Sequence, residues 1–329
     1  MAECLLCGSS HSVDYFPETG YYDIVRCLAC GLVFVRDLPT REDLSVFYSS
    51  SSVHDPVIAN RREINRWHNS YLKRLNSFCS KGSLLDVGCS FGFFLESARE
   101  QGWSVKGVEV AHYPAKHAIK ELGLEVFEGD IFEASFAGEQ FDAITAWHVL
   151  EHTTNPAHIL MEMKRIMRAD GVLGLAVPNI SSAAARMGGP RWEWLGPPSH
   201  LFYFSPETLR GLLQKVGFRV LYIGTCQGRS TPLLYWAWDT CIFGTRLNVV
   251  GRPLIELLSE VANGGNSATR IDKSFGEAAT DPVIGARESL LQKLRAAARG
   301  LEPLSIPAQW IADRLGMGAE IVAFARKIS

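Results

Sequence analysis

Residues 83–92 read Ser-Leu-Leu-Asp-Val-Gly-Cys-Ser-Phe-Gly, a short apolar run that ends in a loop containing two glycines. The apolar part predicts a buried strand, and apolar side chains at helical spacing over 93–101 predict that a helix follows the loop. Gly88 and Gly92 have no Cβ, so the loop amides can approach a ligand closely. This order of strand, loop and helix is typical of the first unit of a nucleotide-binding α/β domain.

The chain on either side continues the alternation of strands and helices. Strands are predicted at 104–110, 124–127, 141–146 and 171–177, and helices at 58–78, 112–122 and 157–168. Such alternation predicts a parallel sheet that is covered by helices on both faces. Ligands of these sheets bind at the carboxyl ends of the strands, so functional side chains are expected there.

Three consecutive predicted strands end in residues that suit a nucleoside ligand. The first carries Asp86 and the glycine loop, the second ends at Glu109, and Asp130 follows the third. A carboxylate at the position of Glu109 can accept both hydrogen bonds of a ribose diol. At Asp130, the acid can bind an adenine amino group and the apolar side chain beside it can pack on the face of the adenine ring.

These residues belong to a set of motifs spread over residues 80–225. The set consists of Leu84-Leu-Asp-Val-Gly-Cys-Ser-Phe-Gly92, Val108-Glu-Val110, Gly129-Asp130, Trp147-His-Val-Leu-Glu-His152 with Asn155-Pro156, Val177-Pro-Asn179 and His200-Leu-Phe-Tyr-Phe-Ser-Pro-Glu-Thr-Leu209. With these motifs the sequence resembles the class I S-adenosylmethionine-dependent methyltransferases, in the branch that includes ubiquinone-type O-methyltransferases and many natural-product and sugar-modifying methyltransferases. Ser90 departs from the glycine that many members carry, which bears on the detail of methionine binding.

The resemblance implies an α/β fold with a Rossmann-like seven-stranded sheet, and S-adenosyl-L-methionine as the cofactor. The last strand of that sheet would be antiparallel, formed by 318–327 and paired with 218–223. The residues that the resemblance places at the cofactor are Asp86, Gly88, Cys89, Ser90, Gly92, Glu109, Val110, Asp130, Ile131, Trp147 and His148.

Methyl transfer from a sulfonium needs a positioned acceptor and, where the acceptor must lose a proton, a base. His152 and His200 follow the fourth and fifth strands, on the side from which an acceptor would approach, so each is a candidate base. A structural role is the alternative for both histidines. The pair Glu151-His152 also resembles the acid and histidine with which some quinone methyltransferases hold a divalent ion. Four further aromatic residues could line an aromatic acceptor pocket, and ordinary core packing explains their presence equally well. They are Trp192, Trp194, Phe202 and Tyr203.

Four cysteines near the N-terminus form the pairs Cys4-Leu-Leu-Cys7 and Cys27-Leu-Ala-Cys30, each followed directly by a glycine. This spacing predicts a zinc ribbon in which four thiolates close around one ion. Because the protein fills all four ligand positions, the zinc is expected to be structural. Four free thiols or two local disulfides are the alternative. Residues 1–40 hold five acidic residues and two arginines, which argues against nucleic-acid binding by this module.

The sequence therefore predicts five segments. They are a zinc module at 1–40, a helical linker or cap at 41–80, the methyltransferase core at 81–226, a helical insertion at 227–316 and the final core strand at 317–329. Amphipathic patterning in the insertion predicts helices that serve as a lid or as the face of a homodimer. Peripheral membrane contact is the alternative, although no basic face accompanies the aromatic residues of the insertion.

Composition narrows the classes of function further. The 329 residues are 47% hydrophobic with a formal net charge of −2, so no basic field draws the protein to nucleic acid. A cytoplasmic protein without a secretory leader or a transmembrane segment is expected. The resemblance to the class I methyltransferases implies the activity, which is O- or C-methylation of a small molecule such as a phenol, a quinone precursor, a natural product or a nucleotide sugar.

Two other functions compete with methyl transfer. A nicotinamide-dependent dehydrogenase is disfavoured because Gly88-Cys-Ser90 breaks the glycine spacing that its fingerprint requires. A binding or scaffold protein that keeps the fold and has lost catalysis is the main alternative, and the intact acids expected at the cofactor argue against it.

Overall fold

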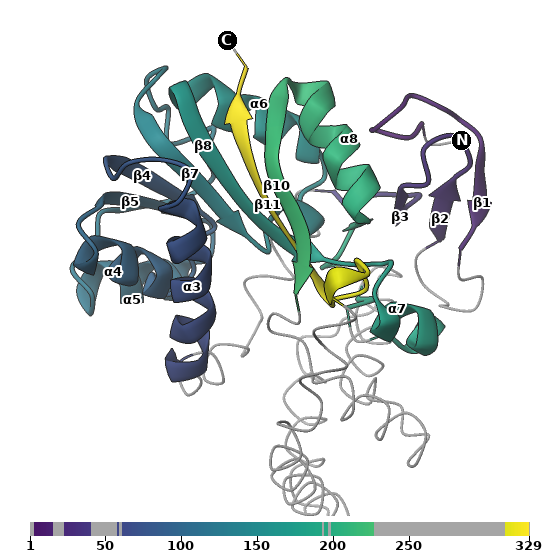
Figure 1. The fold of residues 1–329 in the computed structure, drawn as a ribbon, viewed down its shortest axis with the longest axis horizontal. Coiled ribbons are helices and arrows are strands. Elements are labelled where there is room, and N and C mark those ends of the chain that lie inside the picture. The colour runs from purple at the N-terminus through teal and green to yellow at the C-terminus, as the bar shows by residue number, and fades with distance from the viewer. Residues whose placement is uncertain are drawn as a thin grey trace, which may run out of the picture.

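A computed structural model of the chain describes residues 3–15, 23–40, 58, 61–192, 194–196, 199–226 and 313–328. Within these residues the strands form one sheet of seven strands and one of four. Figure 1 shows the large sheet in the middle of the molecule with helices on both sides, and the small sheet beside it near the N-terminus.

The large sheet has the strand order β10-β11-β8-β7-β4-β5-β6. Its strands are β4 (Ser83–Val87), β5 (Ser104–Glu109), β6 (Val126–Glu128), β7 (Phe141–Trp147), β8 (Met167–Pro178), β10 (Phe218–Cys226) and β11 (Glu320–Lys327). β4 to β8 run parallel, while β11 lies antiparallel between β8 and β10, with Phe218 opposite Lys327 and Cys226 opposite Glu320. The predicted seven-stranded α/β sheet with an antiparallel last strand is confirmed.

Helices cover both faces of this sheet. They are α3 (Arg61–Leu75), α4 (Phe93–Glu100), α5 (His112–Lys120), α6 (Pro156–Ile166), α7 (Ala183–Gly188) and α8 (Pro206–Val216), with short 3-10 helices η1 (Leu150–His152) and η2 (Gly189–Arg191). One hydrophobic cluster joins α3, α4 and α5 to the sheet through side chains such as Leu72 and Phe94. A second cluster, which includes Met163 and Leu212, joins α6 and α8 to it. The two clusters are the two sides of one layered core.

The start of β8 differs from the prediction. The sequence predicts a helix to 168 and a strand from 171, whereas α6 ends at Ile166 and β8 begins at Met167. Phe141 of β7 pairs with Met167 and Ala143 pairs with Val172, so the exposed residues between them form a bulge. Helical periodicity could not reveal this bulge, because the pairing with β7 determines it.

The small sheet joins the N-terminal segment to the core. Its strands, in spatial order, are β1 (Ser12–Asp14), β2 (Ile24–Cys27), β3 (Val33–Val35) and β9 (Phe202–Tyr203). β9 follows β8 in the chain, yet it pairs with β3 so that Phe34 lies opposite Phe202. The predicted module of residues 1–40 therefore shares both a sheet and a hydrophobic cluster with the core.

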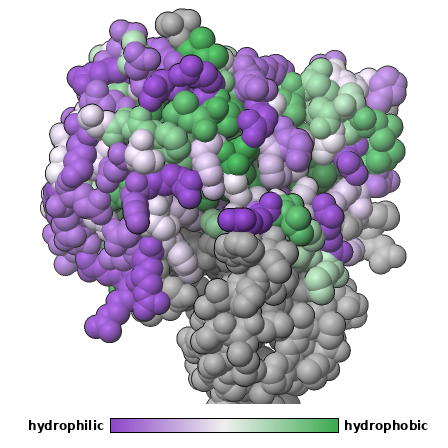
Figure 2. All heavy atoms as spheres, in the orientation of Figure 1, coloured by the Kyte–Doolittle hydropathy of each residue, from purple (hydrophilic) through white to green (hydrophobic). Residues whose placement is uncertain are grey.

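The surface of the small sheet carries exposed hydrophobic side chains. Figure 2 shows hydrophilic side chains over most of the described surface in view, with hydrophobic ones gathered in smaller areas, one of them over the small sheet. Val13 is 45% exposed and Leu28 is 63% exposed. β3, by contrast, is buried on both faces, since Val33, Phe34 and Val35 are each at most 3% exposed.

Two of the predicted segments fall largely outside the described residues. They are the insertion at 227–316, up to residue 312, and the first part of the linker, at 41–57. In the part of the chain that the structure describes, no helix combines the length and the apolar character needed to cross a membrane.

Candidate functional site

A cavity of about 470 Å³ opens at the carboxyl ends of β4, β5 and β7. β4 lies between β5 and β7, so the strand order reverses here, which is where open α/β sheets bind ligands. The predicted residues on its wall are Gly88, Val110, Asp130, Ile131 and His152. Its volume is typical of small-molecule sites.

The glycine loop at the end of β4 has left-handed backbone at three residues. These are Gly88 at φ 70°, Ser90 at φ 49° and Gly92 at φ 79°. A Cβ on Gly88 would lie 2.6 Å from Val149 Cγ2, so this position has no room for a side chain. Ser90 takes a conformation that favours glycine, which accounts physically for the glycine that many family members carry there.

Two buried carboxylates, Glu109 and Asp86, lie beside this loop, and Glu109 binds one of its amides. Ser90 N donates to Glu109 Oε2 at 2.7 Å and Ala111 N donates to Glu109 Oε1 at 2.8 Å. Burial raises the pKa of Glu109, and these amides oppose the rise. Asp86 is 2% exposed and its Oδ1 accepts a hydrogen bond from Thr145 Oγ1 at 2.6 Å. Glu109 retains lone pairs beyond those two hydrogen bonds, so it can also accept from a ribose hydroxyl.

Some residues predicted at the cofactor have their side chains in the core. A Cβ on Gly107 of β5 would lie 2.6 Å from Cys89 Sγ and 2.8 Å from Leu95 Cδ1, so the thiol lies between the face of the sheet and α4. Trp147 packs against Tyr71, with ring centroids 4.7 Å apart, and against Phe94 at 5.3 Å. The structure thus places Cys89 and Trp147 away from the cavity wall. Gly92 is also absent from the wall, and a Cβ added to it would lie 2.6 Å from Leu124 Cδ1.

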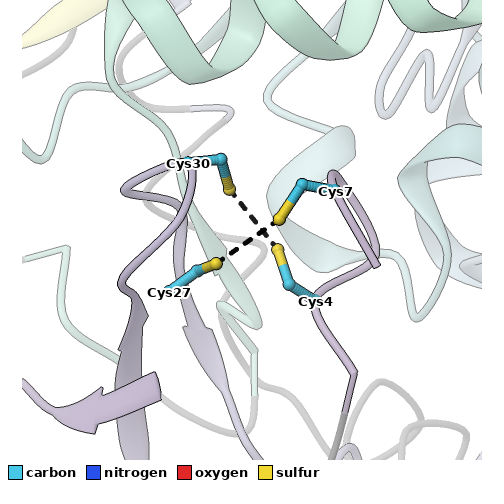
Figure 3. A group of neighbouring side chains, drawn as sticks. All are labelled: Cys4, Cys7, Cys27 and Cys30. Atoms are coloured by element: carbon cyan, nitrogen blue, oxygen red, sulfur yellow. Dashed lines mark hydrogen bonds between the residues drawn. The ribbon is translucent and has the colours of Figure 1, made fainter. Parts of the chain in front are cut away.

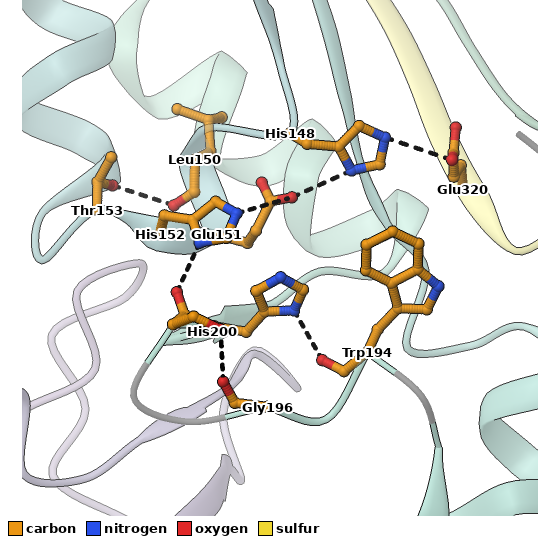
Figure 4. Close-up of polar contacts among 10 residues, drawn as sticks. His148, Leu150, Glu151, His152, Thr153, Trp194, Gly196, His200 and Glu320 are labelled. Carbon is orange, nitrogen blue, oxygen red and sulfur yellow. Dashed lines mark hydrogen bonds and ion pairs between the residues drawn. The ribbon is translucent and has the colours of Figure 1, made fainter. Parts of the chain in front are cut away.

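His148 lies in a buried ionic network rather than on the cavity wall. Its Nδ1 is 3.2 Å from Glu151 Oε1 and its Nε2 is 3.3 Å from Glu320 Oε1, as Figure 4 shows. Tyr71 donates its hydroxyl to Glu320 Oε2 at 2.7 Å. Burial alone would lower the pKa of His148, but the charges of Glu320 and Glu151 outweigh it and raise the pKa to about 9. The ring is therefore an imidazolium between two carboxylates at neutral pH.

Glu151, His152 and His200 come together beside this network. His152 Nδ1 is 2.7 Å from the carbonyl oxygen of Ser199, and His152 Nε2 is 4.0 Å from Glu151 Oε1. His200 Nδ1 is 2.7 Å from the carbonyl oxygen of Trp194. A carbonyl oxygen can only accept a hydrogen bond, so the Nδ1 atom of each histidine carries the proton of that hydrogen bond. In the neutral form of each ring, Nε2 then has the lone pair.

The two histidines differ in exposure. His152 lines the cavity, whereas His200 is 8% exposed and is absent from the cavity wall. Burial, and then the nearby ring of His152, lower the pKa of His200 to about 4, so it is neutral at physiological pH. Burial raises the pKa of Glu151, but the hydrogen bond with His148 and the neighbouring histidines hold it below its usual range.

This group suits two kinds of chemistry. One is proton transfer through His152, with the ionised Glu151 behind it. The other is binding of a divalent ion, because the ligand atoms of Glu151, His152 and His200 all lie within 4.8 Å of one another. His200 is a third member that the resemblance of Glu151-His152 to a metal-holding pair did not predict.

Four aromatic residues were predicted either to line an acceptor pocket or to pack in the core, and three of them are core residues. Trp192, Phe202 and Tyr203 are each at most 2% exposed and belong to the cluster that α6 and α8 cover. Trp194 instead lies between two imidazole rings, with its centroid 5.5 Å from that of His148 and 5.7 Å from that of His200.

Several residues of the cavity wall were not predicted from the sequence. They include Phe132, Val149, Asn155 and His158. His158 stacks on Phe132 with centroids 4.4 Å apart, and Asn155 Oδ1 caps α6 by accepting from His158 N. The pair Asn155-Pro156 is a helix-start signal, and it could have placed the first turn of α6 at this cavity.

The four N-terminal cysteines converge, as Figure 3 shows. The Sγ atoms of Cys4 and Cys30, and those of Cys7 and Cys27, are 3.5 Å apart, and none of the four is in a disulfide. Zinc–sulfur bonds of about 2.3 Å in a tetrahedron place sulfur atoms roughly 3.8 Å apart. Gly8 and Gly31, at φ 75° and 78°, close the two turns. The donor set therefore fits a structural zinc ion.

Comparisons with known sequences extend these observations. A family profile described as a methyltransferase domain matches residues 59–223, which is half of the chain. A ubiquinone biosynthesis O-methyltransferase of Pasteurella multocida is 27% identical over 132 residues, covering 36% of this chain and 54% of that protein. The corresponding protein of Cereibacter sphaeroides is 29% identical over 178 residues, with 51% and 71% covered. The chain spans little more than half the length of several such relatives.

Solved structures give the same fold. A phosphoethanolamine N-methyltransferase 2 of Haemonchus contortus, in complex with S-adenosyl-L-methionine, aligns with a TM-score of 0.52 over 90% of this chain and 62% of that one. The identity is 14%, so this likeness concerns the fold alone. The profile match over half of the chain, on a seven-stranded sheet with a cavity at its switch point, shows that the chain belongs to the class I S-adenosylmethionine-dependent methyltransferase family.

Proposed function

We propose that this protein transfers the methyl group of S-adenosyl-L-methionine to an oxygen or carbon atom of a small-molecule acceptor. The observation that carries the proposal is the position of His152, an imidazole on the wall of the cavity that Gly88 and Asp130 also line. The bound cofactor supplies a methyl group already activated by its sulfonium, so the protein has to provide position and a base.

The cofactor residues divide into three groups in this proposal. Gly88, Val110, Asp130 and Ile131 contact the cofactor, because they line the cavity. Glu109 holds the glycine loop through the amide of Ser90, also accepts from the amide of Ala111 before α5, and offers its remaining lone pairs to the ribose. Asp86, Cys89, Gly92, Trp147 and His148 support the loop and the strand ends from within the core.

His152 is the proposed base. Its Nδ1 is fixed by Ser199, so Nε2 can take the proton of the acceptor while the acceptor atom forms its bond to the methyl carbon. The carbon–sulfur bond breaks and its electron pair stays on sulfur. Glu151, whose Oε1 is 4.0 Å from Nε2, stabilises the imidazolium that forms. His200 stays neutral and orients the neighbouring ring.

The acceptor in this proposal is a phenol, a quinone precursor, a natural product or a nucleotide sugar. The names of the relatives, ubiquinone biosynthesis O-methyltransferases, favour the first two. The zinc is structural, and reduced cysteines at such a site fit a cytoplasmic protein. No role with nucleic acid is proposed, since the net charge is −2.

Calorimetric titration with S-adenosylhomocysteine, with NAD as the control ligand, tests the cofactor. Micromolar binding of the first ligand alone is expected, and its absence would favour the catalytically silent scaffold instead. Transfer of a labelled methyl group from S-adenosyl-L-methionine to phenols, quinone precursors and nucleotide sugars then tests the reaction.

His152→Gln tests the base. We expect kcat to fall by about 10²–10⁴-fold while the affinity for S-adenosylhomocysteine stays within about threefold. His112→Gln is the matched control, because His112 is exposed and lies outside the cavity wall. Activity that a chelator removes and Mg²⁺ restores, with the cysteine-bound zinc retained, would assign Glu151, His152 and His200 to a divalent ion instead.

A further inference from the structure

The second cysteine pair is the turn of a hairpin that reaches the candidate site. β2 ends at Cys27, and Cys27 N donates to Leu32 O at 2.9 Å, just before β3 begins at Val33. β3 therefore begins within one short turn of Cys27 and Cys30, and a shift of this cysteine pair would be passed directly to it.

β3 in turn holds the segment that carries His200. Val35 N donates to Leu201 O at 2.9 Å, and Leu201 N donates to Glu151 O at 2.7 Å. The backbone of Leu201 thus bridges β3 on one side and η1, with Glu151 and His152, on the other. The same segment, residues 199–203, supplies the carbonyl of Ser199 that fixes His152 Nδ1.

The first cysteine pair contacts the core at a different element. Lys215, near the end of α8, donates from Nζ to the carbonyl oxygens of Leu5 and Leu6, at 3.2 and 2.8 Å. Leu5 and Leu6 are the two residues between Cys4 and Cys7. One cysteine pair is therefore anchored on α8 and the other on β3, and an ion that binds all four sulfur atoms joins the two anchors.

The hydrophobic cluster that the small sheet shares with α6 and α8 holds it to the core, but its own strands are short. Its strands are two to four residues long, shorter than strands that are stable by themselves. In small modules of this kind a metal ion supplies a large part of the folding free energy. The stability of β3, and of the hydrogen bond from Val35 N to Leu201 O, should then depend on the ion.

We propose that the ion held by the four cysteines positions residues 199–203, and through them His152 and His200, so that the acceptor side of the site forms only in the metal-loaded protein. The cysteines are positioning residues for His152 and take no part in the chemistry. The role of this coupling in catalysis rests on the proposed function. The coupling itself can be measured without any acceptor.

The test compares full-length protein loaded with zinc, stripped of zinc by a chelator under reducing conditions, and reloaded. Metal content and amide hydrogen exchange in peptides spanning 31–36 and 199–204 are measured, together with the affinity for S-adenosylhomocysteine. We expect about one zinc per chain, exchange in both peptides about tenfold faster after stripping, and cofactor affinity within about threefold. Cd²⁺, which also prefers thiolates, should restore protection, and Mg²⁺ should not.

Variants separate the coupling from general damage. The double variant Cys27→Ser, Cys30→Ser should reproduce the stripped state, while Cys79→Ser should behave as wild type, because Cys79 packs against the other hydrophobic cluster. Once an acceptor is found, kcat should fall on stripping while cofactor binding persists.

Three results would overturn the proposal. They are unchanged exchange in 199–204 after zinc removal, strong protection there in protein purified without metal, and loss of cofactor binding in parallel with protection. Failure to methylate any acceptor would count against the proposed function alone, since exchange and metal content do not depend on turnover.

Discussion

The glutamine variant of His148 tests the buried ionic network most directly. His148→Gln removes the imidazolium that contacts Glu151 and Glu320, whose side chains are 1% and 0% exposed. Removing one partner of a buried ion pair costs about 3–5 kcal/mol, because the carboxylates left behind keep their desolvation penalty. Since domains are stable by only about 5–15 kcal/mol, we expect a large fall in the free energy of unfolding.

The size of this fall should depend on pH. The pKa of His148 is raised from 6.5 to about 9, so the folded state binds this proton more tightly than the unfolded state does. The stabilisation is complete below pH 6.5, declines between pH 6.5 and about 9, and is lost above that. The difference between wild type and His148→Gln should therefore shrink as the pH rises through this window.

Urea unfolding followed by circular dichroism, at pH 6.5 and above pH 9, measures both effects. His112→Gln is the matched control: its Nδ1 lies 2.5 Å from Glu128 Oε1, but its side chain is 72% exposed, so no measurable change is expected. Adding Glu320→Gln to His148→Gln should recover part of the loss, because it removes one of the uncompensated charges. The reasoning fails if the two histidine variants are equally stable at pH 6.5, or if their difference grows with pH.

The remaining predictions concern the cavity and the anchors around it. Gly88→Ala adds a Cβ at a φ of 70° and 2.6 Å from Val149 Cγ2, so calorimetry should show affinity for S-adenosylhomocysteine about tenfold lower or worse. Glu109→Gln weakens the hold on the loop amides and should lower that affinity by roughly tenfold; unchanged binding would contradict its assigned role. Asn155→Ala removes the cap of α6 and should cost about 1 kcal/mol in urea unfolding. Lys215→Met should keep the zinc but speed exchange in residues 3–9, and equal exchange would speak against the α8 anchor.

The sheet and much of the cavity could be predicted from the sequence because their signals are local. The alternation of apolar strands with helices places the strand ends, and strand ends place Gly88, Asp130 and His152 around one cavity. Cys89 and Trp147 lie within the same motifs, but their side chains point into the core. Nearness in sequence does not fix the face from which a side chain projects.

Contacts between distant segments could not be predicted in this way. Glu320 reaches His148 only because β11 enters the sheet between β8 and β10. β9 has two residues, too few for a periodic signal, and its pairing with β3 depends on the folded core. The hydrogen bonds of Leu201 to Val35 and to Glu151, on which the proposed coupling of cysteines and histidines rests, are therefore visible only in three dimensions.

The register of the last two strands bears on how such enzymes diversify. Cys226 lies opposite Glu320, so the chain leaves the sheet and returns to it at adjacent positions, and Glu320 itself contacts His148. The entropy of closing a loop grows slowly, by only about 0.6 kcal/mol for each doubling of its length. Segments of very different length can therefore be exchanged at this junction without disturbing the strands. The end of this strand pair is thus a place where evolution, or an engineer, can add a new segment beside the candidate site and leave the cavity intact.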